Sequence, residues 1–273
     1  MKENPLRKYL RKNALPHFFC SGCGAAQTLN YFVRAADEIN LDFNKLVAIG
    51  GVGCTARIPV YLNAEVLHGV HGRTLPWATG IKLHKPELKV VIFAGDGDAA
   101  AIGGNHLIQA ARRNLDVTVI LVNNLNFAMT GGQAAPTTMQ DLRTTTTPYG
   151  NREKPFDLCK LVIAAGATYV SRWSPVKPMR AIKSIKGALL HKGFSMVEIV
   201  SQCPTNFGRR AISSGDPVKG LEWIGDCSVS QKEARNMTEE ELAGRFVLGD
   251  FVNRQEPVFE GSSIYNQEAS HDG

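Results

Sequence analysis

The chain has 273 residues, of which 44% are hydrophobic and 21% are charged, a composition typical of one large globular domain with or without an extension. The net charge of +6 suits an anionic ligand or an acidic partner, but the sequence has no long basic run and only 8% aromatic residues, which argues against nucleic-acid binding. No apolar run approaches the roughly 18 residues of a membrane helix, and residues 1–16 lack the apolar core of a signal peptide. We therefore expect a cytoplasmic protein that binds neither membrane nor nucleic acid.

The first motif is a pair of cysteines, Cys20 and Cys23, in 17-HFFCSGCGAAQTL-29. Six cysteines are too few for a disulfide scaffold in a chain of this length, and the cytosol is reducing. Such a pair is more typical of a metal site or a catalytic site. The residues that follow place apolar side chains at helical spacing, which predicts a helix over 25–36.

Short β-branched runs alternate with helical patterns through the middle of the chain. The runs are apolar on both faces, as in buried parallel strands, and the alternation indicates an α/β fold with a doubly wound, mostly parallel sheet flanked by helices. Ligands of such sheets bind beyond the C-terminal ends of the strands, which here are the loops after Gly50, Ala94, Val122 and Val200. The predicted strands are 46–50, 88–94, 117–122, 167–171 and 194–200, and the further predicted helices are 98–112 and 175–191.

Three regions follow from these patterns. Residues 1–16 form a basic N-terminal arm, residues 17–205 form the α/β domain, and residues 206–273 form a C-terminal extension that lies over the domain or over a partner chain. Within the domain, residues 123–155 are a long polar stretch, and a loop of this length is usually functional. Within the extension, Thr238 and Glu241 have the spacing of a capping box at the start of a short helix.

Two polar loops follow neighbouring predicted strands. One is 95-GDGDAAAIGGNH-106, and the other is 123-NNLNFAMTGGQ-133. The carboxylate of Asp96, the side-chain carbonyl of Asn124 and the backbone carbonyl of Asn126 are hard oxygen ligands that suit Mg²⁺ together with a diphosphate. Gly95 and Gly97 allow the backbone to approach the anion closely, next to the N-terminus of a helix.

Further candidate residues lie in other loops of the same edge. Cys54 follows the first strand in 50-GGVGCTAR-57, and Cys203 follows a late strand in 200-VSQCPTNFG-208. With Cys20 and Cys23 they provide four thiolates for either Zn²⁺ or a [4Fe–4S] cluster, and spacing alone does not choose between them. The remaining cysteines, Cys159 and Cys227, are interpreted as structural. His71 precedes the diphosphate loop and either approaches the cofactor or is an ordinary loop histidine.

The spacing of GDG and NN resembles the thiamine diphosphate motif. The ordered set FCSGCG, GVGC, HGR, GDGD, NN…TGGQ and SQCP resembles the β subunit of the 2-oxoacid:ferredoxin oxidoreductases over residues 17–208, most closely the 2-oxoglutarate-using members. The resemblance implies the diphosphate-side domain of the thiamine diphosphate fold, with a [4Fe–4S] cluster on the cysteines Cys20, Cys23, Cys54 and Cys203 and Mg²⁺ on Asp96, Asn124 and Asn126. It also implies that the cofactor is lined by Val52, Gly53, Cys54, Thr55, His71, Gly95, Gly97, Asp98, Ala128 and Met129.

The resemblance further implies a reaction and partners. The reaction is coenzyme A-linked oxidative decarboxylation of a 2-oxo acid, with electrons passing one at a time through the cluster to ferredoxin. Since such cofactors need a carboxylate from a second α/β domain, and this chain has room for only one, an α subunit must complete the site, giving an (αβ)₂ heterotetramer. His71 and Arg57 are the candidate catalytic residues. Arg57 is either a clamp for the substrate carboxylate or a surface arginine, and Gly131 stands where some members carry a substrate-binding lysine.

Other functions remain open from the sequence. A non-redox thiamine diphosphate decarboxylase or synthase subunit would share the GDG and NN loops but would not need four cysteines. A zinc-stapled binding protein, basic enough to bind nucleic acid, would account for the cysteines and the charge but would leave those loops without a role. Within the oxidoreductase family, pyruvate and broad-range 2-oxo acids are alternatives to 2-oxoglutarate.

Overall fold

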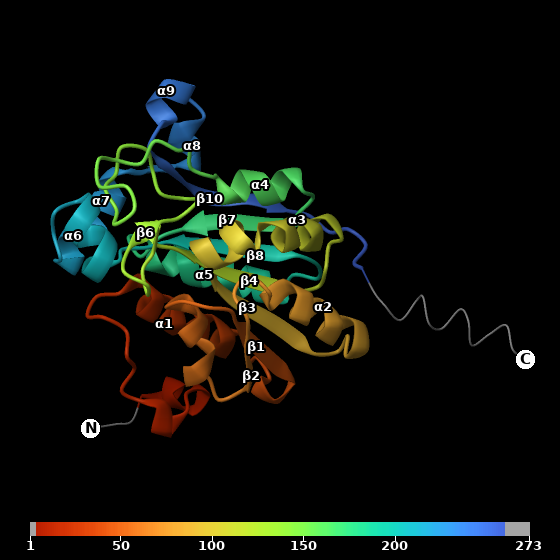
Figure 1. Cartoon of the computed structure of the whole chain (residues 1–273). Coiled ribbons are helices and arrows are strands. Elements are labelled where there is room, and N and C mark those ends of the chain that lie inside the picture. The colour runs from red at the N-terminus through yellow and green to blue at the C-terminus, as the bar shows by residue number, and fades with distance from the viewer. Residues whose placement is uncertain (1–3, 260–273) are drawn as a thin grey trace, which may run out of the picture.

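The computed structural model describes residues 4–259 (Figure 1). Residues 1–3 of the predicted arm and 260–273 of the predicted extension lie outside this range. A single large sheet forms the centre, and all neighbouring strands in it are parallel except β10, which runs antiparallel to β7. Across the sheet the order is β2 (Glu65–His68), β1 (Leu46–Gly50), β3 (Lys89–Gly95), β4 (Thr118–Asn123), β8 (Ser195–Val200), β7 (Tyr169–Trp173), β10 (Phe246–Asn253) and β9 (Ser228–Ser230).

The central strands are buried on both faces because their side chains alternate between two hydrophobic cores. In β3, Val91 and Phe93 belong to one core, whereas Val90 and Ile92 belong to the other. Every residue of β4 and β8 is buried. This double burial accounts for the mostly apolar residues of the predicted strands.

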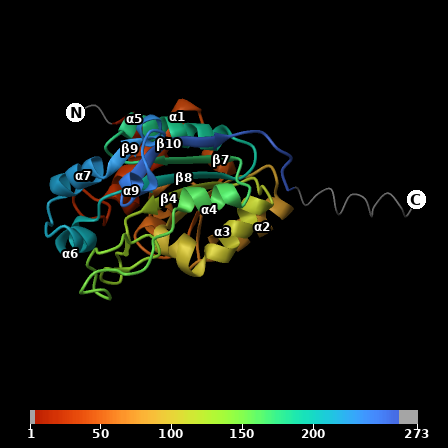
Figure 2. The ribbon, with the colours of Figure 1, turned by 90° about the horizontal axis from the view of Figure 1, so that it is seen from above.

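Helices cover both faces of the sheet, as the view in Figure 2 shows. On one face α1 (Gly24–Glu38) packs beside α5 (Pro178–Leu190), and on the other face lie α2 (Thr74–His84), α3 (Gly104–Arg112) and α4 (Leu158–Ala164). This is the layered α/β architecture that the sequence predicts. The remaining short helices are α6 (Arg209–Ala211), α7 (Pro217–Asp226), α8 (Gln231–Ala234) and α9 (Glu239–Leu242).

The predicted elements agree with the observed ones with three notable differences. The helix predicted over 98–112 is two elements, a π-helix at Gly97–Ile102 and then α3. The long polar stretch contains a small hairpin of β5 (Asn126–Phe127) and β6 (Gln133–Ala134). The strands β2, β9 and β10 were not predicted at all.

Part of the chain after residue 206 is built into the sheet. Strand β10 pairs with β7, and a bulge between Asp250 and Val252 interrupts the pairing. The predicted capping box is confirmed, because Thr238 and Glu241 exchange hydrogen bonds at the start of α9. At the other end of the chain, Tyr9 packs in the core and donates a hydrogen bond to Asp37 of α1. None of the helices within residues 4–259 has the length and apolar character needed to cross a membrane.

Candidate functional site

The C-terminal ends of β1, β3 and β4 surround one pocket of about 120 Å³. These strands are neighbours in the sheet, so their following loops meet at one edge. All the residues predicted to bind the diphosphate or the magnesium line this pocket, and Phe127 and Thr130, which were not predicted, line it as well. The lining residues are Val52, Gly53, Cys54, Thr55, His71, Gly95, Asp96, Gly97, Asp98, Asn124, Asn126, Phe127, Ala128, Met129 and Thr130.

Asp96 and Asn124 provide buried oxygen atoms on adjacent loops. Asp96 is 2% exposed, and burial raises the pKa of its carboxyl to about 7, although its hydrogen bond from Thr137 opposes that change. The Oδ1 atom of Asn124 and the side-chain amide of Asn126 are buried without a hydrogen-bond partner in the protein. A buried polar atom without a partner costs free energy, and a cation or a polar ligand in the pocket would remove that cost.

Asp98 joins three loops at the rim of the pocket. Its Oδ1 atom accepts hydrogen bonds from the backbone N–H of Gly72 at 2.7 Å and of Val52 at 3.4 Å, and it also contacts Nδ1 of His71. An ionised carboxylate can only accept hydrogen bonds, so Nδ1 is the donor in this contact. Asp98 therefore fixes the His71 ring and leaves Nε2 as the nitrogen that is available to a ligand.

Small residues allow these loops to approach one another. A Cβ atom on Gly51 would lie 2.0 Å from Oδ2 of Asp98, and one on Gly97 would lie 2.3 Å from the Phe127 ring. Both glycines are therefore required by close contacts. The sequence analysis gave Gly97 a role in approaching an anion, whereas the structure adds that Phe127 packs directly over it.

The four cysteines predicted to act together are neighbours in the fold. Burial, together with the smaller effects of the nearby Cys23, Cys203 and Cys20, raises the pKa of Cys54 to about 12. Cys20 also accepts a hydrogen bond from the Thr205 hydroxyl.

Backbone contacts hold the Cys20–Cys23 turn against the loop after β8. The N–H of Gly24 donates to the carbonyl of Gln202, and the Gln202 side chain donates to the carbonyl of Gly22.

All six cysteines are free thiols. Within residues 4–259, no three His, Cys, Asp or Glu side chains are grouped closely enough to hold one metal ion.

Arg57 lies apart from the other predicted site residues. It is exposed at the end of the 3₁₀ turn Thr55–Arg57, and it does not line the pocket. Its backbone N–H donates to the carbonyl of Cys54, which ties the turn to the pocket wall.

A buried ionic network contacts the start of the polar loop after β4, and the sequence analysis did not predict it. Glu198 of β8 accepts hydrogen bonds from Nε of Arg172 at 2.7 Å and from the Asn123 side chain at 2.7 Å. Asn123 in turn accepts from the N–H of Leu125, and Cys159 contacts the same carboxylate. The sequence carried one signal of this network, a charged Glu within a mostly apolar predicted strand. Such a residue needs a hydrogen-bonding or charged partner when it is buried.

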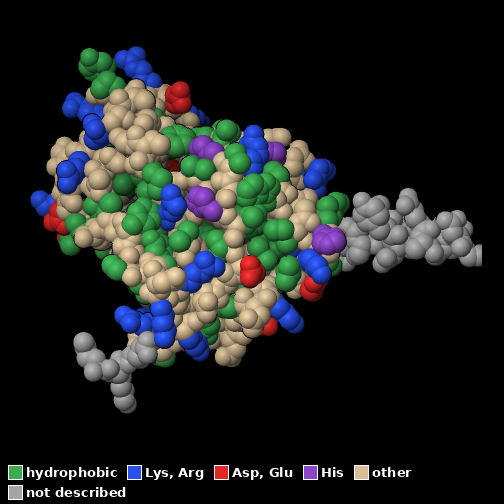
Figure 3. All heavy atoms as spheres, turned by 60° about the horizontal axis from the view of Figure 1, so that its bottom comes forward, with side chains coloured by type: hydrophobic (Ala, Val, Ile, Leu, Met, Phe, Trp, Pro, Cys, Tyr) green, Lys and Arg blue, Asp and Glu red, His purple; other side chains and the backbone are tan. Residues whose placement is uncertain are grey.

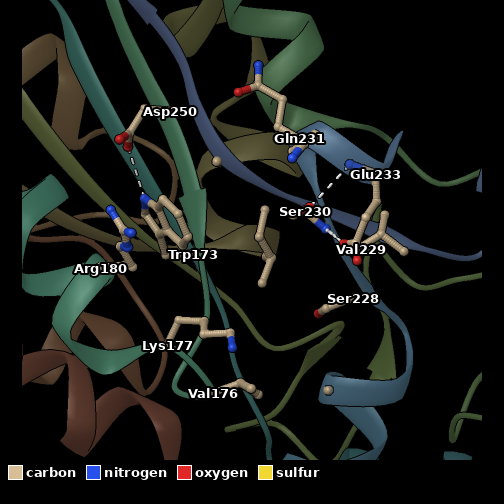
Figure 4. A pocket seen from close by; sticks show the side chains of 14 residues that line it. Trp173, Val176, Lys177, Arg180, Ser228, Val229, Ser230, Gln231, Glu233 and Asp250 are labelled. Carbon is tan, nitrogen blue, oxygen red and sulfur yellow. Dashed lines mark hydrogen bonds between the residues drawn. The ribbon is translucent and has the colours of Figure 1, made fainter. Parts of the chain in front are cut away.

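A larger cavity, of about 810 Å³, lies elsewhere, between the end of β7, the start of α5 and the segment β9–α8 (Figure 4). None of the predicted site residues lines it. Its two carboxylates already have partners within the protein, because Asp250 accepts from the Trp173 indole and Glu233 accepts from the N–H of Ser230.

Hydrophobic side chains are exposed around the mouth of the smaller pocket. Val52 is 38% exposed, Met129 is 42% exposed, and the neighbouring Val70 and Ile102 are 63% and 51% exposed. Figure 3 shows a face of the molecule on which hydrophobic side chains lie among Lys and Arg, with few acidic side chains. Exposed apolar side chains grouped at the mouth of a site are typical of an interaction surface.

Comparison with known proteins agrees with this arrangement. Residues 27–199 match the family model of the thiamine pyrophosphate enzyme C-terminal TPP binding domain. The chain is 47% identical over 256 residues to the 2-oxoglutarate synthase subunit KorB of Methanocaldococcus jannaschii, covering 94% of each chain. It is 50% identical over 214 residues to the KorB subunit of Archaeoglobus fulgidus, covering 78% of this chain and 79% of the relative.

A solved structure extends the similarity to the whole fold. A chain of the 2-oxoglutarate:ferredoxin oxidoreductase from Magnetococcus marinus, with 2-oxoglutarate, coenzyme A and succinyl-CoA bound, superposes with a TM-score of 0.85 at 31% identity. The match covers 100% of this chain and 93% of that one. The chain therefore belongs to the 2-oxoacid:ferredoxin oxidoreductases, as a β subunit of the type named KorB in 2-oxoglutarate synthases.

Proposed function

We propose that this chain, with an α subunit, oxidatively decarboxylates 2-oxoglutarate to succinyl-CoA and CO₂ and passes the electrons to ferredoxin through a [4Fe–4S] cluster. The observation that carries the proposal is the position of Cys54. Cys54 lines the pocket with Asp96 and Asn124, and its thiol also interacts with the thiols of Cys20, Cys23 and Cys203. One residue thus belongs to both the predicted cofactor site and the predicted redox site.

The residues that line the pocket suit the diphosphate of thiamine diphosphate together with Mg²⁺. Asp96 and the Asn124 side-chain carbonyl would hold the metal, with the Asn126 backbone carbonyl as a further ligand, because all are hard oxygen donors. The partnerless Oδ1 of Asn124 supports this assignment. Backbone groups of Gly97, Ala128 and Met129 would lie along the diphosphate. When bound, thiamine diphosphate accepts the electron pair that decarboxylation releases.

Cys20, Cys23, Cys54 and Cys203 would hold a [4Fe–4S] cluster, for which cysteine thiolates are the usual ligands. When bound, a cluster accepts single electrons, which Zn²⁺ does not do.

Two side chains have proposed roles toward the substrate. His71 is oriented by Asp98, so that Nε2 is free to exchange a proton or a hydrogen bond with a ligand in the pocket. Arg57 lies one helical turn beyond Cys54, where a guanidinium could pair with a substrate carboxylate once the partner subunit encloses the site. Both groups act by binding and orientation at the pocket mouth.

The size of the pocket supports the need for a partner. Its volume of about 120 Å³ is below the roughly 300–1,000 Å³ of typical small-molecule sites. The exposed Val52 and Met129 at its mouth suit burial by another chain. We therefore propose an α subunit that supplies the pyrimidine-side domain and its carboxylate, in an (αβ)₂ assembly in the cytoplasm.

An anaerobic visible spectrum of the αβ complex tests the proposal, recorded before and after addition of 2-oxoglutarate and coenzyme A. We expect a broad absorption near 400 nm that bleaches with substrate. Bleaching with pyruvate but not with 2-oxoglutarate would keep the reaction and change the substrate. A colourless complex prepared without oxygen would refute the redox function.

A further inference from the structure

The long loop after β4 places two adjacent threonines against the two predicted metal-binding loops. Thr137 is 2% exposed and Thr138 is fully buried. The hydroxyl of Thr137 donates to Oδ2 of Asp96 at 2.5 Å, and the hydroxyl of Thr138 donates to the carbonyl of Leu125 at 2.7 Å. One dipeptide therefore contacts both loops, the first after β3 and the second after β4.

Thr137 restricts the orientation of the Asp96 carboxylate. A hydrogen bond to one oxygen fixes the plane of the carboxylate, which has lone pairs to spare for a metal. Hydrogen bonds from outside the first shell of ligands orient metal ligands in this way in many metal sites. Because Asp96 is buried, few other groups can take over this role.

Thr138 holds the turn between the other two predicted ligands. Leu125 has a φ of +62°, which is unfavourable for a residue with a side chain and persists only where the surroundings fix it. Its carbonyl is held by Thr138, and its N–H is held by Asn123. The conformation at Leu125 determines where Asn124 before it and Asn126 after it are directed.

The threonine pair is itself fixed to the body of the loop. The hydroxyl of Thr138 accepts from the N–H of Ala135 at 2.8 Å, and its carbonyl accepts from the Asn151 side chain at 2.7 Å. Asn151 is buried, and it also accepts from the N–H of Glu153. The loop is therefore a braced element, and movement of one threonine would displace the other.

We propose that Thr137 and Thr138 are positioning residues that set the spacing of the two metal-binding loops for Mg²⁺ and diphosphate. The inference rests on the proposed cofactor site and adds residues to it that neither the motif nor the comparisons assign. The pair acts through Asp96 and Leu125, and neither threonine lines the pocket.

The test compares Thr137→Val, Thr137→Ala and Thr138→Val in the intact αβ complex. Mg²⁺ is titrated at fixed thiamine diphosphate after chelation, and cofactor binding is followed by protein fluorescence. We expect each change to weaken Mg²⁺-dependent binding about 10- to 100-fold, since hydrogen bonds to charged or buried groups have this effect. Thr137→Ser and Thr138→Ser keep the hydroxyl, so their affinity should stay within a few fold of that of the unaltered complex.

Thr118→Val is the matched control. Thr118 is fully buried at the start of β4, the opposite end of the strand from Asn124, and its hydroxyl donates to the carbonyl of Ala188, so binding should stay within about twofold. Thermal unfolding in EDTA without cofactor separates stability from affinity. Binding unchanged by substitution at both Thr137 and Thr138, or weakened equally by Thr118→Val, would overturn the inference. An unaltered complex without Mg²⁺-dependent binding would instead refute the proposed cofactor site, and the inference with it.

Discussion

Replacing Asp98 tests whether the pocket depends on the contacts between its loops. Asp98→Asn keeps an oxygen that can accept from the N–H groups of Gly72 and Val52 but removes the negative charge. Asp98→Leu removes the acceptor altogether. We expect both variants to weaken thiamine diphosphate binding, and the leucine variant to do so more, because the loops that carry His71 and Val52 would lose their common anchor.

The hydrogen bonds of Asp98 determine how much affinity for thiamine diphosphate each variant should lose. A hydrogen bond to a charged group contributes about 1.5–3 kcal/mol and a neutral one about 0.5–1.5 kcal/mol, so each strong contact loses about 1 kcal/mol in Asp98→Asn. The contacts of Gly72 and His71 count fully, and the 3.4 Å contact of Val52 counts little. The total of about 2 kcal/mol corresponds to roughly 30-fold weaker binding. Asp98→Leu also leaves the Gly72 N–H without a partner, which adds about 1–3 kcal/mol.

Calorimetric titration of thiamine diphosphate into the αβ complex, with Mg²⁺ in excess, measures the effect. Gly51→Ala reaches the same carboxylate by another route, since its Cβ would lie 2.0 Å from Oδ2 of Asp98. Asp116→Asn is the control, because this carboxylate also accepts a backbone N–H, that of Gly193, but does not line the pocket. Affinity within twofold of the unaltered complex for both Asp98→Leu and Gly51→Ala would refute the role of Asp98.

Three further changes give distinct outcomes. Cys54→Ser should lower the iron and acid-labile sulfide content of the anaerobically purified complex, and full retention of four irons per chain would contradict its role as a ligand. Arg57→Ala should raise KM for 2-oxoglutarate about tenfold or more with unchanged thiamine diphosphate affinity, because it loses a charged pair; unaltered kinetics would make Arg57 a surface residue. Lys89→Met should raise the unfolding temperature at pH 7, because burial lowers the pKa of Lys89 from 10.5 to about 8, against the opposing effect of Asp116. The folded chain then binds fewer protons than the unfolded chain between about pH 8 and 10.5. The charged Lys89 therefore lowers the free energy of unfolding by about 3 kcal/mol below pH 8, and this loss disappears as the pH rises through that window. A gain in unfolding temperature that does not depend on pH would contradict this reasoning.

The position of the site could be predicted because its motifs follow buried parallel strands. Asp96 comes directly after β3 and Asn124 directly after β4, and these strands are neighbours. A parallel sheet brings the C-terminal ends of neighbouring strands to one edge, so the order of motifs along the chain determines which loops meet. The same rule brought Cys54 after β1 and Cys203 after β8 to that edge.

The strands at and next to the edges of the sheet could not be predicted from local pattern. Strand β10 includes Gly249 and Asp250, which interrupt its apolar run, and it pairs with β7 far away in the sequence. Glycine and aspartate are disfavoured in strands, so only tertiary pairing stabilises this segment. In β2, only four residues form the strand, and none of them is fully buried.

The roles of neighbouring polar residues also could not be separated by sequence, because they depend on which atoms already have partners. Asp98 and Asn124 are equally polar members of their motifs. Yet Oδ1 of Asp98 is committed to the other loops, whereas Oδ1 of Asn124 is buried with no partner within the protein.

Leaving such an atom buried and unsatisfied costs about 1–3 kcal/mol, which the folded chain bears until a ligand supplies the missing contact. Committed atoms hold the loops in place, and this positioning means that little ordering of the loops is needed when the ligand binds. Bonded and unpartnered atoms can belong to one residue, because Oδ1 of Asp98 accepts from the other loops whereas its Oδ2 is buried without a partner. We predict that substitutions at Asn124 remove a proposed metal contact directly, whereas those at Asp98, Thr137 and Thr138 act by loosening the loops around them.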